Sequence, residues 1–388
     1  MLRGESGTTR PLDRATIFEV GSVTKTFTAL LLAEMVRRGE VRLEEPIDEL
    51  LPPNVIAPAH DGKRITLLDL ATQSSGLPRL PDNLAPRDPR NPYAGYDDAR
   101  LFEFLSHYRM TRDPGAQYEY SNLGVGLLGR LLALRAKTGY EALVRARILE
   151  PLKMESTAVT LGPALRARLA TGHDVDAESV ENWDLDALAG AAGLRSDVRD
   201  MSLYLRAVMS GTGRLGEDAR AAEEPRRDGP PGNRIGLAWN TTAHGVVWHN
   251  GETGGYHAFI GFDEGRNRGI VVLANTALSF DDIAMRWLDS TEALAKTYRT
   301  IPLDRDALGP FVGTYKLAGQ SLVVTREGDR LYAKYDQQPR FRIYPYAPAK
   351  FFYKVVDAQI DFTVENGRAT SLVLHQGGRD FTAERIDG

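Results

Sequence analysis

The 388-residue chain contains no cysteine, and this absence removes several kinds of chemistry at once. Disulfide bonds, thiol nucleophiles and zinc–thiolate sites are excluded, because each of them needs a cysteine sulfur. The absence does not fix a cellular compartment, since cysteine-free proteins occur on both sides of a membrane. The chain also lacks a metal-binding HExxH sequence and a nucleotide-binding Walker sequence, so we expect neither a metal nor another cofactor.

An excess of charge of one sign and a long apolar run are missing as well. The 48 basic and 52 acidic residues give a net charge of -4, which gives no reason to expect nucleic acid or an anionic membrane as a partner. No apolar run could cross a bilayer, and residues 1–5 lack the apolar core of a signal peptide. We expect no nucleic-acid partner, no membrane span and a cytoplasmic location for the chain as written, or a periplasmic or secreted one if a preceding segment is absent from it.

The order of sequence patterns predicts two parts of different architecture. With 42% hydrophobic residues, the chain can bury one large core and a smaller one. Residues 311–386 read as nearly continuous strands with glycine-containing turns, which predicts a small antiparallel barrel or sandwich. A linker is expected over 301–308.

The first part mixes helices with strands. A short helix capped by Thr66 and a surface loop over 78–98 are expected, and the polar stretch 211–232 reads as exposed and mobile. Apolar periodicity predicts helices over 26–38, 99–108, 123–137, 140–149, 197–209 and 281–296. Short β-branched or aromatic runs predict strands over 16–20, 234–239, 246–249, 256–262 and 269–273.

The most informative stretch for chemistry is Ser22-Val23-Thr24-Lys25, between the first predicted strand and the first predicted helix. Residues three apart on a helix share a face, so the Ser22 hydroxyl and the Lys25 amine can form a hydrogen bond. A lysine can take the serine proton only if burial or nearby cations lower its pKa. The helix N-terminus could also stabilise an oxyanion. Taken alone, the tetrapeptide is better explained by an N-cap serine and a solvated lysine.

Two later stretches carry further polar groups. Tyr120 and Asn122 lie two apart on a predicted loop and could point together into a cleft. A tyrosine before an asparagine N-cap would be the structural explanation. His249 ends a predicted strand, and Gly251 would let a ligand approach the strand edge. A single histidine at a strand end is more often structural, so each stretch gains weight only from the others.

In this order, the SxxK, YxN and HxG sequences resemble the serine penicillin-recognising enzymes. The chain is most similar to the branch that holds class C β-lactamases, D-alanyl-D-alanine carboxypeptidases with an HTG box, D-aminopeptidases and family VIII esterases. The resemblance covers nearly all of residues 10–296. Flanking sequences at 18–21, 70–78, 150–154, 191–194 and 254–256 support it.

The resemblance implies a role for each residue of the first two boxes. Ser22 would be the acylated nucleophile, and Lys25 would be its hydrogen-bonded proton acceptor. Tyr120 would serve as general base or proton shuttle. Asn122 would hold Lys25 and the acyl amide of the substrate.

The third box would complete the site. The backbone N–H groups of Ser22 and Glu252, the residue after Gly251, would form an oxyanion hole. His249 stands where β-lactamases of this branch carry a lysine, and a histidine is only partly charged near neutral pH. We therefore rank β-lactam hydrolysis below ester or small-peptide hydrolysis. Arg195 and Arg234 are candidate partners for an anionic substrate group.

The resemblance also implies a fold and a reaction. We expect an α+β, β-lactamase/transpeptidase-like domain over residues 1–300, with an antiparallel sheet flanked by helices and an all-helical region, and a lipocalin-like barrel over 306–388. The expected function is a serine hydrolase that acts through an acyl-enzyme on small esters or on amide or peptide substrates. A class C-like β-lactamase, a penicillin-binding protein with slow turnover, or a silent binding protein are the alternatives.

One departure from the family pattern concerns the start of the chain. Family members usually have a helix and a strand before the segment that matches residues 16–20. Without them, a sheet edge or an apolar helix face would be uncovered. We therefore expect self-association into a homo-oligomer, or low stability.

Overall fold

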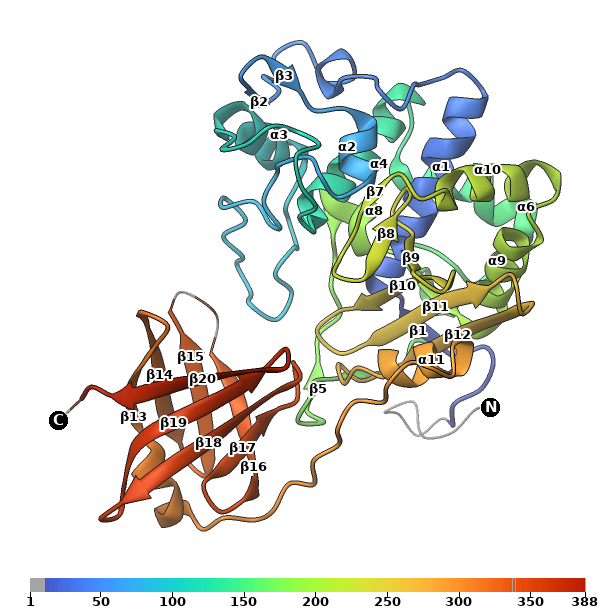
Figure 1. The fold of residues 1–388 in the computed structure, drawn as a ribbon. Helices are drawn as coiled ribbons and strands as arrows, with labels where there is room; N and C mark the ends of the chain where they lie inside the picture. Colours follow the sequence, from blue (N-terminus) through green and yellow to red (C-terminus); the bar gives the residue numbers. More distant parts are fainter. Residues whose placement is uncertain (1–10, 337, 339, 388) are drawn as a thin grey trace. The chain divides into compact units, whose positions relative to one another are not determined.

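The computed structural model describes residues 11–336, 338 and 340–387. The chain forms two compact units, Met1–Glu292 and Ala293–Gly388, with separate hydrophobic cores (Figure 1). The first unit combines sheets with helices, and the second is a closed antiparallel barrel. The predicted fold class is therefore confirmed.

The first unit is organised around a six-stranded antiparallel sheet. The strand order is β12-β11-β10-β9-β8-β7, and the long strands β10 and β11 pair from Val247 opposite Phe262 to Glu252 opposite His257. A separate pair joins β1 (Ile17–Glu19) to β6 (Arg195–Asp197). The sheet strands are β7 (Arg227–Asp228), β8 (Asn233–Ile235), β9 (Asn240–Thr242), β10 (Val247–Glu252), β11 (His257–Asp263) and β12 (Arg268–Ala274).

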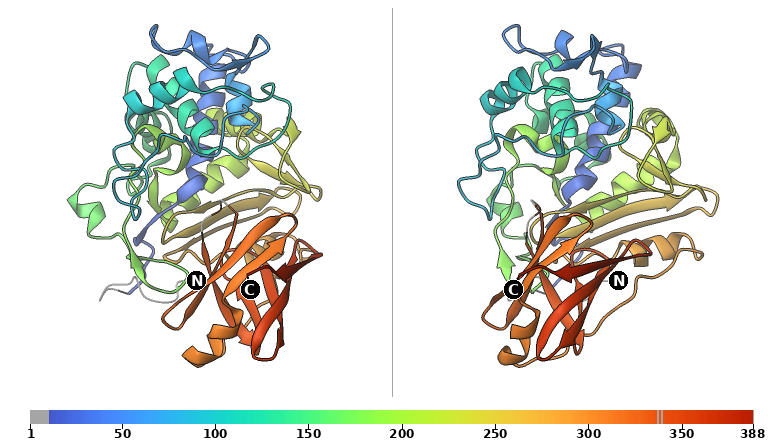
Figure 2. Two further views of the ribbon diagram at one scale, coloured as in Figure 1. Left: turned by 90° about the vertical axis from the view of Figure 1, so that its left-hand side faces the viewer. Right: turned by 60° about the vertical axis from the view of Figure 1, so that its left-hand side comes forward.

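The two faces of this sheet pack against different helices. Successive side chains of a strand point to opposite faces, and on β11 Ile260 and Phe262 belong to the large core while Phe259 packs with Leu288 of α11 (Asp281–Leu288). In Figures 1 and 2, α11 lies on one side of β10–β12, and α1 (Thr24–Arg37) and α9 (Val198–Ser210) lie on the other. The start of α1 is therefore held inside the unit, next to the sheet.

Helices make up most of the rest of this unit. In α1, twelve of fourteen residues are buried, as expected for a helix enclosed on all sides. Two short hairpins, β2–β3 (Ala59–His60 and Lys63–Arg64) and β4–β5 (Gly172–His173 and Ser179–Val180), complete the unit. The remaining helices are α2 (Leu67–Ala71), α3 (Asp98–His107), α4 (Asn122–Arg135), α5 (Tyr140–Val144), α6 (Glu150–Leu152), α7 (Pro163–Arg166), α8 (Ala189–Ala192) and α10 (Gly213–Glu223).

The prediction of an exposed stretch over 211–232 was only partly correct, because it missed a helix with a buried side. Helix α10 occupies half of it and packs on α1. Its buried side consists of small residues such as Ala219 and Ala222, together with Asp218, which accepts a hydrogen bond of 2.6 Å from Arg37 Nε. Small side chains let two helices approach closely, but they give a weak hydrophobic pattern. The polar composition of the stretch therefore did not predict this packed helix.

Two other predicted elements end earlier than expected. The segment 234–239 is not one strand, because Gly236 and Ala238, the latter at φ +62°, form a turn between β8 and β9. Helix α11 ends at Leu288 rather than near residue 296. The other predicted helices and strands of this unit lie within a few residues of their expected positions, apart from residues 145–149, which form one turn of π-helix. None of the helices among the described residues has the length and apolar character needed to cross a membrane.

The second unit is an eight-stranded barrel closed between its first and last strands. Tyr315 on β13 lies opposite Arg385 on β20, so neither strand has an open edge along the paired stretch. Glycine-containing turns, as predicted for this part of the chain, lie at 327–329, 366–367 and 377–378, and each joins two neighbouring strands. The strands are β13 (Gly313–Leu317), β14 (Gln320–Glu327), β15 (Arg330–Tyr335), β16 (Phe341–Ala347), β17 (Lys350–Tyr353), β18 (Ala358–Glu365), β19 (Arg368–Gln376) and β20 (Arg379–Arg385).

Candidate active site

The SxxK sequence forms a tight turn from β1 into α1. Gly21 has φ +50°, a conformation that L side chains rarely adopt, and residues Gly21–Val23 form a short 3-10 helix before α1. Lys25 Nζ lies 2.9 Å from Ser22 Oγ. Ser22 does not cap the helix with its side chain, and Lys25 is fully buried. The explanation by an N-cap serine and a solvated lysine therefore does not hold.

Lys25 is bound by neutral oxygen atoms from distant parts of the chain. Besides Ser22 Oγ, its Nζ donates to Asn122 Oδ1 and to the Ala191 carbonyl oxygen, each at 2.8 Å. No acidic residue among those described forms a salt bridge with it. Burial lowers the pKa of Lys25 well below its ordinary value, and the positive charge of Arg79 lowers it further. A neutral amine with a free lone pair is thus accessible, and such an amine can accept the serine proton.

Tyr120 completes the contacts of the serine hydroxyl. Its Oη donates to Ser22 Oγ over 2.7 Å, and its ring centroid lies 4.9 Å from Lys25 Nζ. Burial raises the pKa of Tyr120 above its ordinary value, although the hydrogen bond to Ser22 and the charge of Arg79 both act in the opposite direction. The phenol is therefore neutral near pH 7, so it is suited to pass a proton on rather than to act as a phenolate base.

The loop before α4 fixes Tyr120 and Asn122. Ser121, not Asn122, is the N-cap of α4, and its Oγ accepts a hydrogen bond of 2.8 Å from the Gly124 N–H. The Ser121 N–H donates to Gln73 Oε1, and its hydroxyl donates to the Pro78 carbonyl oxygen. These bonds tie the loop to the segment after α2, so Tyr120 and Asn122 on either side of Ser121 both reach the Ser22–Lys25 pair.

Strand β10 lies directly against the Gly21–Ser22 turn. A Cβ atom on Gly21 would lie 2.7 Å from Glu252 N, and one on Gly251 would lie 2.9 Å from Ser22 N and 2.0 Å from the Val20 carbonyl oxygen. Only glycine permits this approach. These close approaches place the N–H groups of Ser22 and Glu252 next to each other. The first N–H groups of a helix have no partner within it, and an oxyanion hole requires such free donors side by side.

His249 is present at the site but does not provide a cation. Its side chain is 3% exposed, and its Nδ1 lies 2.5 Å from the Asn250 carbonyl oxygen, which fits a neutral ring with hydrogen on Nδ1. Burial lowers the pKa of His249 to about 4, and the positive charge of Lys25 contributes to that shift. At pH 7 the residue in the place of the β-lactamase lysine is therefore uncharged.

The two arginines predicted to bind an anionic substrate group are engaged elsewhere. Arg195 is buried and lies 3.3 Å from Glu19 and 3.2 Å from Asp184. Arg234 is exposed and donates to the Arg227 carbonyl oxygen, at the far end of the sheet. Both arginines therefore have partners within the protein, and the exposure of Arg234 fits a solvated side chain.

A different cation, Arg79, lies at the site and was missed. Its Cζ is 5.1 Å from the centroid of the Tyr120 ring. It follows directly after the Gly76-Leu77-Pro78 turn, in the predicted surface loop over 78–98. Its position in the sequence was a usable signal, since that turn is one of the flanking matches to the family.

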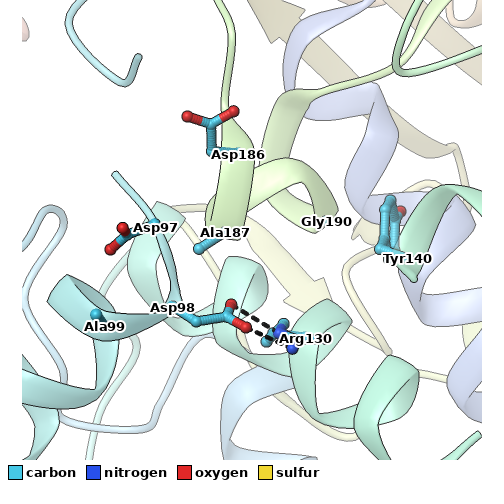
Figure 3. A pocket seen from close by; sticks show the side chains of 8 residues that line it. All are labelled: Asp97, Asp98, Ala99, Arg130, Tyr140, Asp186, Ala187 and Gly190. Carbon is cyan, nitrogen blue, oxygen red and sulfur yellow. Dashed lines mark hydrogen bonds and ion pairs between the residues drawn. The ribbon is translucent and has the colours of Figure 1, made fainter. Parts of the chain in front are cut away.

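Other hollows and polar clusters lie apart from these residues. A hollow of about 410 Å³ is lined by Asp98, Arg130, Asp186 and Tyr140, among others, and contains none of the site residues (Figure 3). Its acidic groups already have partners, because Arg130 binds Asp98 and the Gly95 N–H donates to Asp186. We therefore regard it as a surface hollow.

Two groups of histidine and carboxylate could geometrically hold a metal ion. They are His60 with Asp61 and Asp113, and His244 with Asp289 and Glu292. Lys63 binds Asp113 over 2.5 Å, and Arg266 lies 3.6 Å from Asp289, so each group already has a cation beside it. Neither group contains a residue of the Ser22 site.

Comparison with protein families gives two matches. Residues 3–294 match the model described as "Beta-lactamase", and residues 299–387 match a "Domain of unknown function (DUF3471)". Among curated proteins, a "Beta-lactamase" of Escherichia coli is 27% identical and aligns with 69% of this chain and 77% of its own length. A penicillin-binding protein of Bacillus subtilis is 24% identical, with 97% and 89% covered. The "D-alanyl-D-alanine-carboxypeptidase/endopeptidase AmpH" of Escherichia coli is 30% identical over 53% of each chain.

Solved structures agree on the fold of the first unit. The "Beta-lactamase/D-alanine Carboxypeptidase" of Yersinia pestis superposes with a TM-score of 0.63 at 23% identity, covering 71% of this chain and 82% of that one. A class C β-lactamase of Rhodobacter sphaeroides gives a TM-score of 0.62 at 23% identity, with 72% and 86% covered.

Proposed function

Because this chain belongs to the beta-lactamase family and is a serine hydrolase, we propose that it cleaves small esters or small amide and peptide substrates through an acyl-enzyme on Ser22. The observation that carries this proposal is the pair of contacts to Ser22 Oγ, 2.9 Å from Lys25 Nζ and 2.7 Å from Tyr120 Oη. A serine hydroxyl needs a neighbouring base, and here a buried amine, which forms no salt bridge among the described residues, lies in contact with it.

The reaction would proceed in two steps. Ser22 Oγ would lose its proton to neutral Lys25 and attack the carbonyl carbon, while the N–H groups of Ser22 and Glu252 would stabilise the oxyanion. The bond to the leaving group would then break, and Tyr120 would pass the proton to the leaving atom. Water would release the acyl group by the same route. Asn122, bound to Lys25, would keep the amine in place and could also contact the acyl amide of the substrate.

Ester and peptide substrates rank above β-lactams because His249 is neutral at pH 7. A lysine at this position would supply a permanent charge for the carboxylate of a β-lactam. A second candidate, β-lactam hydrolysis or acylation with slow turnover, is favoured by the names of the curated relatives. A protein of this fold that binds without turnover is the third.

The experiment is intact-protein mass spectrometry after mixing with p-nitrophenyl acetate, nitrocefin or a fluorophosphonate, with turnover of the two chromogenic compounds followed in parallel. We expect a fluorophosphonate adduct and ester turnover in the unmodified protein and neither in Ser22→Ala. Ser202→Ala, which changes an exposed serine of α9, is the matched control. No Ser22-dependent adduct or turnover with any probe would contradict the proposal, and turnover of nitrocefin above the ester would favour the second candidate.

A further inference from the structure

We propose that Gln73 is a positioning residue, which holds Tyr120 in contact with Ser22 so that the phenol can deliver a proton to the leaving atom of the substrate. This inference rests on the proposed function and adds to the same site a residue that lies in none of the three sequence boxes. Three observations carry it: two hydrogen bonds on either side of Tyr120, the burial of one of their donors, and the strained backbone of Gln73.

Two hydrogen bonds to one residue flank Tyr120. The N–H group of Glu119 donates to the Gln73 carbonyl oxygen, and the N–H group of Ser121 donates to Gln73 Oε1, each over 2.7 Å. The residues directly before and after Tyr120 are therefore both tied to Gln73. A loop is ordinarily more mobile than the helices it connects, but here the backbone is fixed on both sides of the tyrosine. The phenol can then reach Ser22 Oγ at 2.7 Å.

The two bonds differ in what they require of the residue at position 73. Any residue can supply the backbone carbonyl oxygen that binds Glu119. The bond to Ser121 needs a side chain that carries an acceptor at the reach of a glutamine. Ser121 is 1% exposed, and a buried N–H group needs a partner. The Gln73 side chain is thus the part of this contact that a substitution can remove.

The backbone of Gln73 is in an unfavourable conformation. Gln73 follows the end of α2 with φ +56°, in the left-handed region where helix ends usually carry glycine or asparagine. Its side chain is buried, and its Nε2 atom has no hydrogen-bond partner among the described residues. A glycine would avoid both costs but would lose the bond to Ser121. Residues kept in strained conformations are concentrated at functional sites, where the surrounding structure holds them.

The chemistry of the leaving group separates positioning from general stability. When Ser22 Oγ bonds to the carbonyl carbon, the bond from that carbon to the leaving atom breaks. A nitrophenolate leaves without a proton, whereas an alkoxide must take one, and Tyr120 is the group placed to deliver it. A displaced phenol should therefore slow alkyl esters more than nitrophenyl esters. A loss of folded protein would affect both equally.

The first test compares ethyl acetate with p-nitrophenyl acetate. Both form the same acetyl-enzyme, so the ratio of their kcat/KM values reports on the leaving group. Gln73→Asn suits a positive φ and keeps an amide, but it is one methylene too short to reach Ser121. We expect it to lower the ethyl-to-nitrophenyl ratio by about 10- to 100-fold. Gln73→Gly is the second variant, and Gln117→Asn, at an exposed position of the same loop, is the matched control.

A double-mutant cycle tests whether Gln73 acts through Tyr120. In Tyr120→Phe the phenol is gone, so adding Gln73→Asn should leave the ratio unchanged. A further fall as large as that in the unmodified protein would show that Gln73 acts by another route, and the proposal would be wrong. An unchanged ratio in both Gln73→Asn and Gln73→Gly would overturn it as well.

A spectroscopic measurement separates this proposal from the proposed function. In protein with ¹³C at the tyrosine Cζ atoms, Tyr120→Phe identifies the Tyr120 signal among those of the 15 tyrosines. Ser22→Ala removes the hydroxyl that Tyr120 contacts, so it should shift this signal in the Gln73 protein and leave it in place in Gln73→Asn. If that dependence is found but no Ser22-dependent turnover occurs, the hydrolase proposal fails and Gln73 still positions Tyr120. An equal shift in both backgrounds, or none in either, contradicts the role of Gln73.

Discussion

Lys25 Nζ lies 2.9 Å from Ser22 Oγ while the lysine side chain is fully shielded from water. A buried ammonium ion is costly unless an opposite charge compensates it, and the other two partners of this amine are the neutral oxygens of Asn122 and Ala191. The surroundings therefore favour the uncharged amine, which is the form that can take a proton from the serine.

Replacing Lys25 by arginine should abolish most of the activity. Arginine stays protonated at all relevant pH values, so Lys25→Arg keeps a nitrogen donor near Ser22 but replaces the neutral proton acceptor with a permanent cation. We expect a loss of about 10²- to 10⁴-fold in kcat/KM for p-nitrophenyl acetate. The measurement is initial-rate kinetics, with Lys137→Arg at an exposed position as the control. Activity in Lys25→Arg close to that of the unmodified protein would exclude Lys25 as the base.

The pH dependence of kcat/KM should follow the deprotonation of Lys25. Because the neutral amine is the active form, the rate should rise as pH increases through the pKa of Lys25, which burial places well below 10.5. His249, with a pKa of about 4, is already neutral over this range. A pH–rate profile between pH 5 and 10 should therefore show one ascending limb that persists in His249→Gln. Loss of that limb in His249→Gln would assign it to the histidine.

Gly21→Ala should damage both stability and activity. The alanine would need φ +50°, and its Cβ would lie 2.7 Å from Glu252 N, one of the two expected oxyanion donors. We expect a loss of about 1–3 kcal/mol in the free energy of unfolding and at least about 10²-fold in kcat. Chemical denaturation and ester kinetics measure the two effects.

Gly39→Ala is the matched control for this change. Gly39 has φ +71°, but nothing lies within 4 Å of a Cβ built on it. It should lose stability through backbone strain alone and keep full activity per folded molecule. Equal kcat values for the two variants would contradict a role of the Gly21 contact in catalysis.

Glu223 should make the protein less stable as pH rises. Burial, with a contribution from Glu264, raises the pKa of Glu223 from 4.5 to about 8. Between these values the folded state binds more protons than the unfolded state, so the free energy of unfolding falls with increasing pH. Glu223→Gln should therefore stabilise the protein by about 2–4 kcal/mol at pH 8.5 and by little at pH 4.5. Urea denaturation at both pH values measures this.

Glu217→Gln, on an exposed position of the same helix, controls for the loss of one negative charge. It should shift both denaturation curves by less than about 0.5 kcal/mol. If Glu223→Gln behaves in the same way at both pH values, the carboxyl of Glu223 is solvated and its pKa is ordinary.

The local part of the site could be predicted from the sequence. A helical pattern after a strand-like run places Ser22 and Lys25 on one face, and the structure has them there. Assembly of the other groups could not be predicted from periodicity, because Asn122 and Ala191 lie 97 and 166 positions from Lys25. For Tyr120, Asn122 and His249, resemblance to a family supplied what spacing alone did not.

Two features of the structure were not predicted from the sequence, and each has its own physical cause. Helix α10 was missed because its buried residues are small. A hydrophobic pattern identifies large apolar side chains and does not show how closely two helices approach each other. Arg79 was missed although it follows a turn that matches the family, because what places it beside Tyr120 is a pair of hydrogen bonds from α4 to its carbonyl oxygen. Loops and closely packed small residues are the places where sequence patterns carry the least information about contacts.

The distant partners of Lys25 also constrain when the site can exist during synthesis. On a growing chain, Lys25 is followed by nearly a hundred residues before Asn122 appears, and Ala191 comes still later. Until those residues have left the ribosome and packed, the lysine is an ordinary solvated amine and the serine an ordinary alcohol. We therefore expect a chain that ends before Ala191 to be unreactive toward a fluorophosphonate at Ser22, so that this reactivity would report completed folding of the first unit.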